Sequence, residues 1–477
     1  MIIKGYIFGI LYALVCLLLA LVLYKLGMPK KYSRKFVHIL VGAEWIILSH
    51  YMGATYHFLV VCLFFLLLLS VSYFKNLMPM ISSESDNAPG TVYYAVAMSI
   101  MAVICLFLPD MMLPFGIGVM CTSLGDGFAG IVGQAVKSNN PKIYQNKTLF
   151  GSLANFLFSS GTAIVFKLVF DMNLKIWHCF MIGLFSVILE MVTLFGLDNI
   201  ATTLGAAFLA YAFISFPIIE IFAFPIVFTP LIIAVVIEKK VLTKMGLALA
   251  ILLDIIVSLT LGNFGFVLLL TFLFGSVIVD KIKKHKHNDD SIVKKGDTRD
   301  AIQVIANGLI PMVMAILYSI TMNKVFIVGY AAALAEAFAD TCASGIGVYS
   351  KSTLDLFKMK KIKLGLSGGV SVIGTVASLV GALVISAIAL AFGAVNVKLF
   401  MIVSLSAFLG AFFDSFLGSL FQIKYKCNVC EEITERELHC NKKTEKYSGF
   451  AFFDNDVVNL MSGLFSAVFA TLIASFI

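Results

Sequence analysis

Long apolar segments follow one another along almost the entire chain, and only short polar stretches separate them. Of the 477 residues, 60% are hydrophobic and 13% are charged, whereas a soluble domain has about 25% charged residues. A membrane-spanning helix needs roughly 20 predominantly apolar residues. The sequence therefore predicts an all-α polytopic membrane protein with about sixteen transmembrane helices. The expected spans are 5–24, 36–50, 55–74, 92–108, 112–136, 152–170, 177–195, 201–216, 218–237, 246–261, 265–280, 301–321, 324–349, 365–392, 397–421 and 452–476.

Basic residues gather on alternate connections between these segments. They occur in the first connection, at Lys25–Lys35, in the polar run 281–299 and in the loop 422–449. Because short basic loops stay on the cytoplasmic side, these connections are expected in the cytoplasm and both termini on the opposite side. The net charge of +8 then reflects membrane topology, and no nucleic-acid partner is expected.

Several patterns recur in the same order in two parts of the chain, residues 1–240 and 241–477. Chance similarity is the alternative, since small residues are common in membrane helices, but the shared order favours two tandem related halves. The matches are Asp126-x-x-Ala129-x-x-x-Gly133 with Asp340-x-x-Ala343-x-x-x-Gly347, TLFGSLANF (148–156) with LGLSGGVSVIGT (364–375), Asp198 with Asp414, and RKFVHILVG (34–42) with RDAIQVIANG (299–308).

Carboxylates, basic residues and a glycine-rich helix start are expected together at the cytoplasmic face of each half. Mg²⁺ is held by one or two carboxylates plus phosphate oxygens, and backbone N–H groups at a helix N-terminus bind anionic oxygens. The predicted ligand is therefore a magnesium-bound polyphosphate, with Asp126 and Asp340 as metal or phosphate ligands. Lys147 could instead be an ordinary basic loop residue, and His38 a helix-packing histidine.

Three of the nine cysteines lie in the loop 422–449, whereas the other six lie in apolar segments. Cys427-x-x-Cys430 and His439-Cys440 together offer four ligands for a closed structural zinc site. The expected cytoplasmic location argues for metal binding over disulfides. An ordinary charged loop is the alternative, since Glu and Lys alternate there.

The first half, roughly 30–235, resembles the phytol kinase/dolichol kinase family, and part of its pattern also occurs in CDP-diacylglycerol synthases. Phe150 and Gln134 stand where that kinase family usually has Glu and often has Arg. The matching elements are Arg34-Lys-x-x-His38-x-x-x-Gly42, Gly125-Asp126-x-x-Ala129, Lys147-Thr-x-x-Gly151-Ser152 and Glu190 with Asp198-Asn199.

The second half, roughly 245–477, resembles the DUF92 family, which includes phytyl-phosphate kinases. The resemblance covers nearly the whole half. The matching elements are Gln303-Val-x-Ala-Asn307-Gly308, Ala339-Asp340-Thr341-x-Ala343-Ser344, Ser367-Gly-Gly-Val-Ser371-x-x-Gly374-Thr375, Asp414-Ser415-x-x-Gly418, the four Cys/His residues, and Asp454-Asn455-Asp456-x-Val458-Asn459.

The two resemblances imply a tandem membrane kinase. The first half would phosphorylate an isoprenoid alcohol such as phytol or geranylgeraniol, and the second would convert the monophosphate to the diphosphate. The implied partners are the prenyl lipid, the membrane, Mg²⁺ and a nucleoside triphosphate (CTP, UTP or ATP), with the sites facing the cytoplasm. A CTP-dependent cytidylyltransferase and a lipid transporter or flippase are the alternatives.

The residues expected to act in these reactions fall into three groups. The catalytic group is Arg34, His38, Asp126, Lys147, Asp340 and Lys363; the nucleotide- and phosphate-binding group is Gly125, Gly151, Ser152, Asn307, Ser367, Gly368, Gly369 and Ser371; and the magnesium ligands are Asp126, Glu190, Asp198, Asp340 and Asp414.

Overall fold

The structure is a computed structural model of the whole chain, and it describes all residues except 76–88, 137–138, 194–195, 287–297 and 356. The chain divides into two compact units, Met1–Ala234 and Val235–Ile477. The division lies close to the expected boundary after residue 240, and each unit is described by itself.

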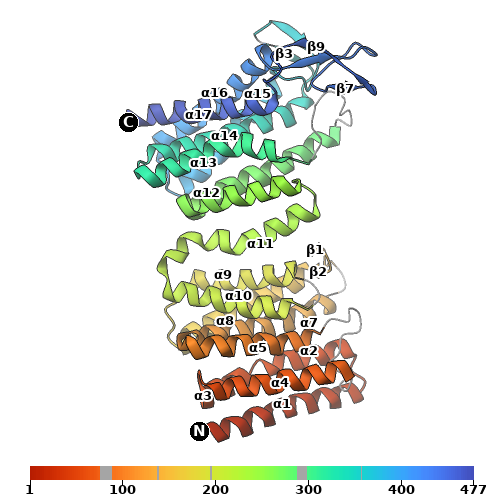
Figure 1. Cartoon of the computed structure of the whole chain (residues 1–477), viewed down its shortest axis with the longest axis vertical. Coiled ribbons are helices and arrows are strands. Elements are labelled where there is room, and N and C mark those ends of the chain that lie inside the picture. The colour runs from red at the N-terminus through yellow and green to blue at the C-terminus, as the bar shows by residue number, and fades with distance from the viewer. Residues whose placement is uncertain (76–88, 137–138, 194–195, 287–297, 356) are drawn as a thin grey trace. The chain divides into compact units, whose positions relative to one another are not determined.

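The first unit is built from helices that lie side by side (Figure 1). A hairpin of the short strands β1 (Lys142–Tyr144) and β2 (Lys147–Thr148) leads into α8. The helices of the first unit are α1 (Ile2–Lys25), α2 (Lys30–Val41), α3 (Glu44–Met52), α4 (Tyr56–Lys75), α5 (Gly90–Phe107), α6 (Met112–Met120), α7 (Gly127–Ala135), α8 (Leu149–Val169), α9 (Ile176–Val192), α10 (Asp198–Ser215) and α11 (Ala223–Glu238, which extends past the unit boundary), with short helical turns at Pro109–Met111 and Pro217–Phe222.

Two irregularities in the first unit shape its site. The expected span 36–50 is divided between α2 and α3 at Gly42, where a side chain would collide with Ser123. Between α6 and α7 the chain forms a π-helical turn, η2 (Cys121–Asp126). A π-helical turn contains an extra residue and changes the direction of the side chains that follow. Asp126 is the last residue of this turn.

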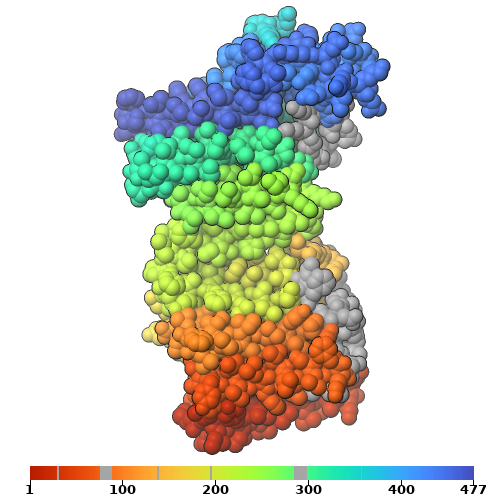
Figure 2. All heavy atoms as spheres, viewed as in Figure 1, coloured from red at the N-terminus to blue at the C-terminus, as the bar shows by residue number. Residues whose placement is uncertain are grey.

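In its described residues, the second unit combines six helices with short strands. The strands form the hairpins β3–β4 and β7–β8 and the antiparallel sheet β6–β5–β9, which gather at one end of the helices and project from them in Figure 2. The elements are α12 (Lys244–Lys286), α13 (Ala301–Thr321), α14 (Val325–Ile346), a short turn at Gly347–Tyr349, β3 (Thr353–Asp355), β4 (Lys360–Ile362), α15 (Val372–Ala391), α16 (Val397–Leu420), β5 (Lys424–Lys426), β6 (Ile433–Thr434), β7 (Leu438–His439), β8 (Lys442–Lys443), β9 (Glu445–Ser448) and α17 (Asn455–Ser475).

The prediction of a polytopic helical membrane protein is confirmed. Twelve helices among the described residues are long and apolar enough to cross a membrane. The α12 helix is counted once although Gly262, at a φ of 60°, interrupts it, while α2, α3, α9 and α10 are not among the twelve. The number sixteen stays a prediction, as does the relation between the halves.

The interior of each unit suits close helix packing. In α14, the run Gly329–Ala335 is fully or almost fully buried and consists largely of alanine. Small side chains let helix backbones approach one another, which is how membrane helices gain packing contacts. As a result α14 packs against α12, α13, α15, α16 and α17 at once, and it carries Asp340 within this cluster.

Candidate functional site

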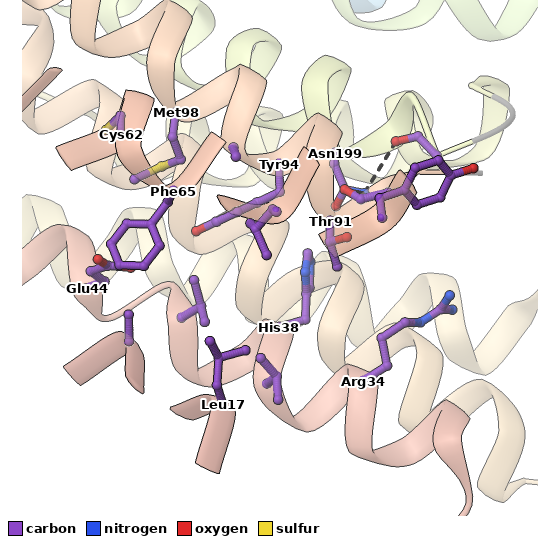
Figure 3. A pocket seen from close by; sticks show the side chains of 18 of the residues that line it. Leu17, Arg34, His38, Glu44, Cys62, Phe65, Thr91, Tyr94, Met98 and Asn199 are labelled. Atoms are coloured by element: carbon purple, nitrogen blue, oxygen red, sulfur yellow. Dashed lines mark hydrogen bonds between the residues drawn. The ribbon is translucent and has the colours of Figure 1, made fainter. Parts of the chain in front are cut away.

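A cavity of about 280 Å³ lies within the first unit, between α1, α2, α3, α4, α5, the end of η2 and the start of α10. One end is polar and includes Arg34, His38, Asp126 and Asn199, whereas the rest is mainly apolar. Figure 3 shows Arg34, His38 and Asn199 toward one side and Phe65 and Cys62 toward the other. The apolar lining includes Ala13, Leu17, Val41, Leu48, Val61, Cys62, Phe65, Leu69, Ala95 and Met98.

Asp126 is held at the polar end by two residues of α2. Lys35 Nζ lies 2.6 Å from Asp126 Oδ2 and 3.2 Å from the Asp126 carbonyl oxygen. His38 Nε2 lies 3.5 Å from the same carboxylate oxygen and 3.0 Å from the carbonyl oxygen of Thr122. Lys35 was absent from the predicted site, yet its ammonium lies where a metal ion on Asp126 would be expected.

A second ion-paired cluster surrounds Lys147, which β2 places beside the ends of α9 and α10. Lys147 Nζ lies 2.5 Å from Glu190 Oε1 and 3.9 Å from Asp198 Oδ2. Asn155 donates a hydrogen bond of 2.5 Å to the other oxygen of Glu190. Burial lowers the pKa of Lys147, but Glu190, Asp126 and Asp198 outweigh burial and raise it above its usual value. The predicted magnesium ligands of this unit thus face lysine ammonium groups.

The first turn of α8 has its backbone N–H groups occupied by the protein itself. The N–H of Leu149 donates to the Pro141 carbonyl oxygen (2.9 Å), and that of Phe150 donates to Asn140 Oδ1 (3.1 Å). The hydroxyl of Thr148 accepts from the N–H of Gly151 (3.4 Å). A phosphate at this helix start would have to displace these partners. Ser152 follows in the same turn and is half-buried.

Glu44 lies in the lining of the first cavity, near Phe65 and away from Arg34 (Figure 3). Its side chain is 6% exposed, and no hydrogen-bond partner of its Oε1 occurs among the described residues. Gly125, by contrast, faces α8, where a side chain would collide with Ser159 and Asn155. Gly125 therefore serves helix packing in this structure.

The second unit contains a cavity of about 250 Å³ with a mainly polar lining. Asp340 of α14 and Asp414 of α16 both line it. Asp414 Oδ2 accepts a hydrogen bond of 3.4 Å from Ser462, while no hydrogen bond or ion pair with a described residue reaches the Asp340 carboxylate. The other charged or acidic lining residues are Lys283, Glu435, Asp454 and Asp456. Acidic groups outnumber basic ones, which is the composition expected of a cation site.

Residues 364–371 form a turn along one wall of the second cavity, so that α15 begins seven residues later than the predicted span 365–392. Gly365 and Gly368 adopt φ values of 86° and 84°, which L side chains rarely adopt. A side chain at Gly368 would also lie 2.5 Å from the Ser419 backbone nitrogen. Gly369 packs against Thr353. These glycines bring the turn close to α16 and β3.

Glu435 reaches this turn from the loop between β6 and β7. Its carboxylate accepts hydrogen bonds from the Ser367 N–H (3.1 Å) and from the Ser367 hydroxyl. Lys424 Nζ donates to the Ser367 carbonyl oxygen (2.8 Å). Burial raises the pKa of Glu435, and the Ser367 donors act in the opposite direction. The donors of Ser367 that were expected to bind phosphate are therefore engaged by a carboxylate that sequence reasoning had not included.

The starts of α8 and α15 share a local geometry. Ser371 accepts a hydrogen bond of 3.1 Å from the Gly374 N–H, as Thr148 does from Gly151. A Cβ on Gly347 would lie 3.5 Å from the Gly374 Cα, and one on Gly133 would lie 3.5 Å from the Gly151 Cα. Gly374 therefore has the same local geometry as Gly151, and it lies within the segment 364–375 that the sequence analysis matched with 148–156.

The structure also gives the places of Asp198, Asp414, Lys363 and Asn307. Asp198 begins α10, whereas its predicted match Asp414 lies within α16. Lys363 lies outside the lining of the second cavity, and its Nζ pairs with Glu432 Oε1 at 2.7 Å at the surface, where the two side chains are 48% and 40% exposed. Asn307 also lies outside that lining and donates to the Gln303 carbonyl oxygen (3.0 Å).

The four predicted zinc ligands lie together at the ends of the short strands. Their ligand atoms are all within 4.8 Å of one another. His439 Nδ1 lies 3.4 Å from the sulfurs of both Cys430 and Cys440, and those two sulfurs are 3.8 Å apart. The backbone N–H groups of Cys430 and Val429 lower the pKa of Cys427 to about 6.

Comparison with known proteins identifies similar membrane proteins. The family model "Integral membrane protein DUF92" matches residues 227–467. The chain is 32% identical to an uncharacterized membrane protein of Methanocaldococcus jannaschii over 164 residues, which are 33% of the chain and 65% of that protein. It is 26% identical to a phytol kinase of Synechocystis sp. over 193 residues, 39% of the chain and 80% of the kinase. It is 23% identical to Protein VTE6, chloroplastic, of Arabidopsis thaliana over 243 residues, 50% of the chain and 66% of that protein. No solved structure matches the chain.

Proposed function

The chain belongs to the DUF92 family of integral membrane proteins, and from this premise we propose that it is a membrane kinase for isoprenoid lipids. The first unit phosphorylates a prenol such as phytol or geranylgeraniol, and the second unit phosphorylates the resulting monophosphate to the diphosphate. A nucleoside triphosphate (CTP, UTP or ATP) supplies the phosphate at a cytoplasmic face. The similarity to a phytol kinase supports this class of substrate.

The shape and chemistry of the first cavity carry the proposal. Its polar end offers Arg34 and His38 near Asp126, and its longer part is lined by apolar side chains of α1, α4 and α5. A prenol has one hydroxyl on a long hydrocarbon chain. The hydrocarbon would lie along Leu17 and Phe65 while the hydroxyl points toward the polar end. A mainly apolar cavity with a few convergent polar groups is typical of a small-molecule binding site.

The acidic lining of the second cavity supports a magnesium-bound diphosphate as its proposed ligand. Asp340 and Asp414 would hold Mg²⁺, since Asp340 has no partner among the described residues and both carboxylates line one cavity. A bound Mg²⁺ neutralises charge on the transferring phosphate. The helix start at Ser371 would face the transferred phosphate, where backbone N–H groups favour an anion. Lys283 supplies positive charge on the same lining.

The first unit would handle phosphate differently, because its carboxylates already face ammonium groups. Lys35 neutralises Asp126, and Lys147 lies against Glu190 and near Asp198. These residues do not fit a resident Mg²⁺ without movement of the lysines. In the proposed reaction Arg34 and Lys147 offset phosphate charge, and Mg²⁺ enters with the nucleotide. Phosphoryl transfer depends mainly on such positioning and charge neutralisation.

The decisive experiment supplies purified protein with prenols, prenyl monophosphates and each labelled nucleoside triphosphate in the presence of Mg²⁺. Mass spectrometry of the lipid products should show one added phosphate per step. A cytidylyl adduct would instead indicate a cytidylyltransferase. Lipid movement in liposomes without nucleotide consumption would indicate a transporter. No phosphorylated product from demonstrably folded protein would contradict the proposal.

A further inference from the structure

The loop that carries the Cys/His cluster also contributes to the wall of the second cavity. The β5–β6 hairpin pairs Lys426 with Ile433 and Tyr425 with Thr434, and Glu435 follows directly after β6. Cys427 and Cys430 lie at the turn of this hairpin. His439 and Cys440 come after Glu435, so pairs of cluster residues flank Glu435 in the sequence on both sides.

The distances within the cluster match a tetrahedral zinc site. With Zn–S bonds of about 2.3 Å and a Zn–N bond of about 2.05 Å, tetrahedral geometry places two sulfurs about 3.8 Å apart and a sulfur and a nitrogen about 3.6 Å apart. The Cys430–Cys440 sulfur separation is 3.8 Å, and His439 Nδ1 lies 3.4 Å from each of these sulfurs. Four protein ligands leave no open position, which is typical of a structural site.

Glu435 connects the cluster to the cavity. Although it belongs to an otherwise charged and mostly exposed loop, its side chain is only 6% exposed. Both donors of Ser367 point at its carboxylate, and Ser367 stands in the turn 364–371 before α15. Lys424 of β5 holds the carbonyl oxygen of the same residue. Glu435 and Lys424 thus hydrogen-bond the N–H, the hydroxyl and the carbonyl oxygen of Ser367, the three polar groups of that residue.

We propose that the Cys/His cluster is a structural zinc site that holds Glu435 against Ser367, and that zinc binding thereby orders the turn 364–371 of the second cavity. The strands around the cluster are short, because β5 pairs with β6 and β7 with β8 over two residues each. Metal binding closes the segment 427–440 and restricts its conformations. Glu435 is a positioning residue in this account, since it acts on the cavity through Ser367.

The zinc content of the full-length protein in detergent is the first measurement. Elemental mass spectrometry should find about one zinc ion per chain, as four protein ligands imply. Cys430→Ser should lose the metal. Cys105→Ala, which removes a buried cysteine of α5 in the first unit, should retain it. A folded wild-type protein that binds no zinc would overturn the proposal.

Hydrogen exchange then tests the link to the cavity independently of activity. Chelation of zinc should increase amide exchange in residues 364–371 by about tenfold, and returning zinc should reverse the change. Glu435→Ala should have the same effect with zinc still bound, and Glu435→Gln, which keeps an acceptor for the Ser367 N–H, should have a smaller one. The matched control is Glu432→Ala, which removes a carboxylate of the same loop that pairs with exposed Lys363.

Unchanged exchange in 364–371 after zinc removal would contradict the link, as would equal effects of the Glu435 and Glu432 variants. The consequence for catalysis rests on the proposed kinase function. There Glu435→Ala should raise the KM for prenyl monophosphate by about tenfold with a smaller change in kcat. If no phosphorylation occurs with any donor, the proposed function fails, while zinc content and exchange still decide this inference.

Discussion

The ion pair between Lys35 and Asp126 permits a quantitative prediction. The two side chains are 15% and 12% exposed, and their charged atoms are 2.6 Å apart. Lys35→Met removes the ammonium and leaves the carboxylate in contact with His38, at 3.5 Å. Loss of one partner of a buried pair typically costs 3–5 kcal/mol. Because both groups retain some exposure, we expect about 3 kcal/mol, or about a 150-fold change in the unfolding equilibrium.

The double variant Lys35→Met/Asp126→Asn separates charge from packing. If the unpaired Asp126 carboxylate causes the loss of stability, removing its charge should restore about 2 kcal/mol of unfolding free energy relative to Lys35→Met alone. The assay is reversible unfolding in mixed detergent micelles, followed by circular dichroism. As a control, Lys239→Met removes a pair whose side chains are 65% and 38% exposed, and it should cost less than about 1 kcal/mol. A double variant no more stable than Lys35→Met would refute the reasoning.

Four further predictions concern the two cavities and their supports. Asp340→Asn should reduce diphosphate formation from a prenyl monophosphate at least about a hundredfold, because a carboxylate ligand of Mg²⁺ is lost; normal turnover of the folded variant in a labelled-nucleotide assay would remove Asp340 from the mechanism. Phe65→Ala should lengthen the apolar part of the first cavity and shift the kcat/KM preference toward longer prenols, whereas an unchanged preference across a chain-length series would argue against lipid binding there. Ser371→Ala should destabilise the second unit by about 1 kcal/mol through loss of the α15 cap, measured by the same unfolding assay. Burial raises the pKa of Asp355, but hydrogen bonds from the N–H groups of Lys358 and Phe357 and from Ser419 together lower it. The ionised Asp355 therefore stabilises the folded protein above the unfolded pKa of about 3.9, and this stabilisation is lost as pH falls through the lower folded pKa. Asp355→Asn should accordingly flatten the decline in unfolding free energy below about pH 4.

The helices were predictable because their apolar segments have membrane-spanning length. The break at Gly262 also fell between two predicted spans, since glycine interrupts the apolar run there. The start of α15 was misplaced by seven residues, because Leu364 and Leu366 continue the apolar pattern while Gly365 and Gly368 adopt positive φ values. Hydropathy does not distinguish a glycine that packs in a helix from one that ends it.

The candidate site was predictable only where residue type alone indicates chemistry. Asp126 and Asp340 stood out as acids within apolar segments, and both line cavities. Lys35 did not stand out, because a lysine beside Arg34 is typical of a basic loop. The available signal was its spacing of three residues from His38, which places both side chains on one helix face. Glu435 had no such signal, since its role depends on a contact with Ser367, 68 residues away in the sequence.

The division of α2 and α3 at Gly42 has a consequence for biogenesis. Neither helix alone reaches the length needed to cross the membrane, and the first carries Arg34, Lys35 and His38. Such a segment is a poor substrate for independent insertion by a translocon, because charged residues in a short helix oppose partitioning into lipid. Since α1 packs against both helices, the three would enter the bilayer together as a helical hairpin. Because α2 carries the polar residues of the first cavity, insertion of the first unit into the membrane would depend on the strongly apolar helix α1.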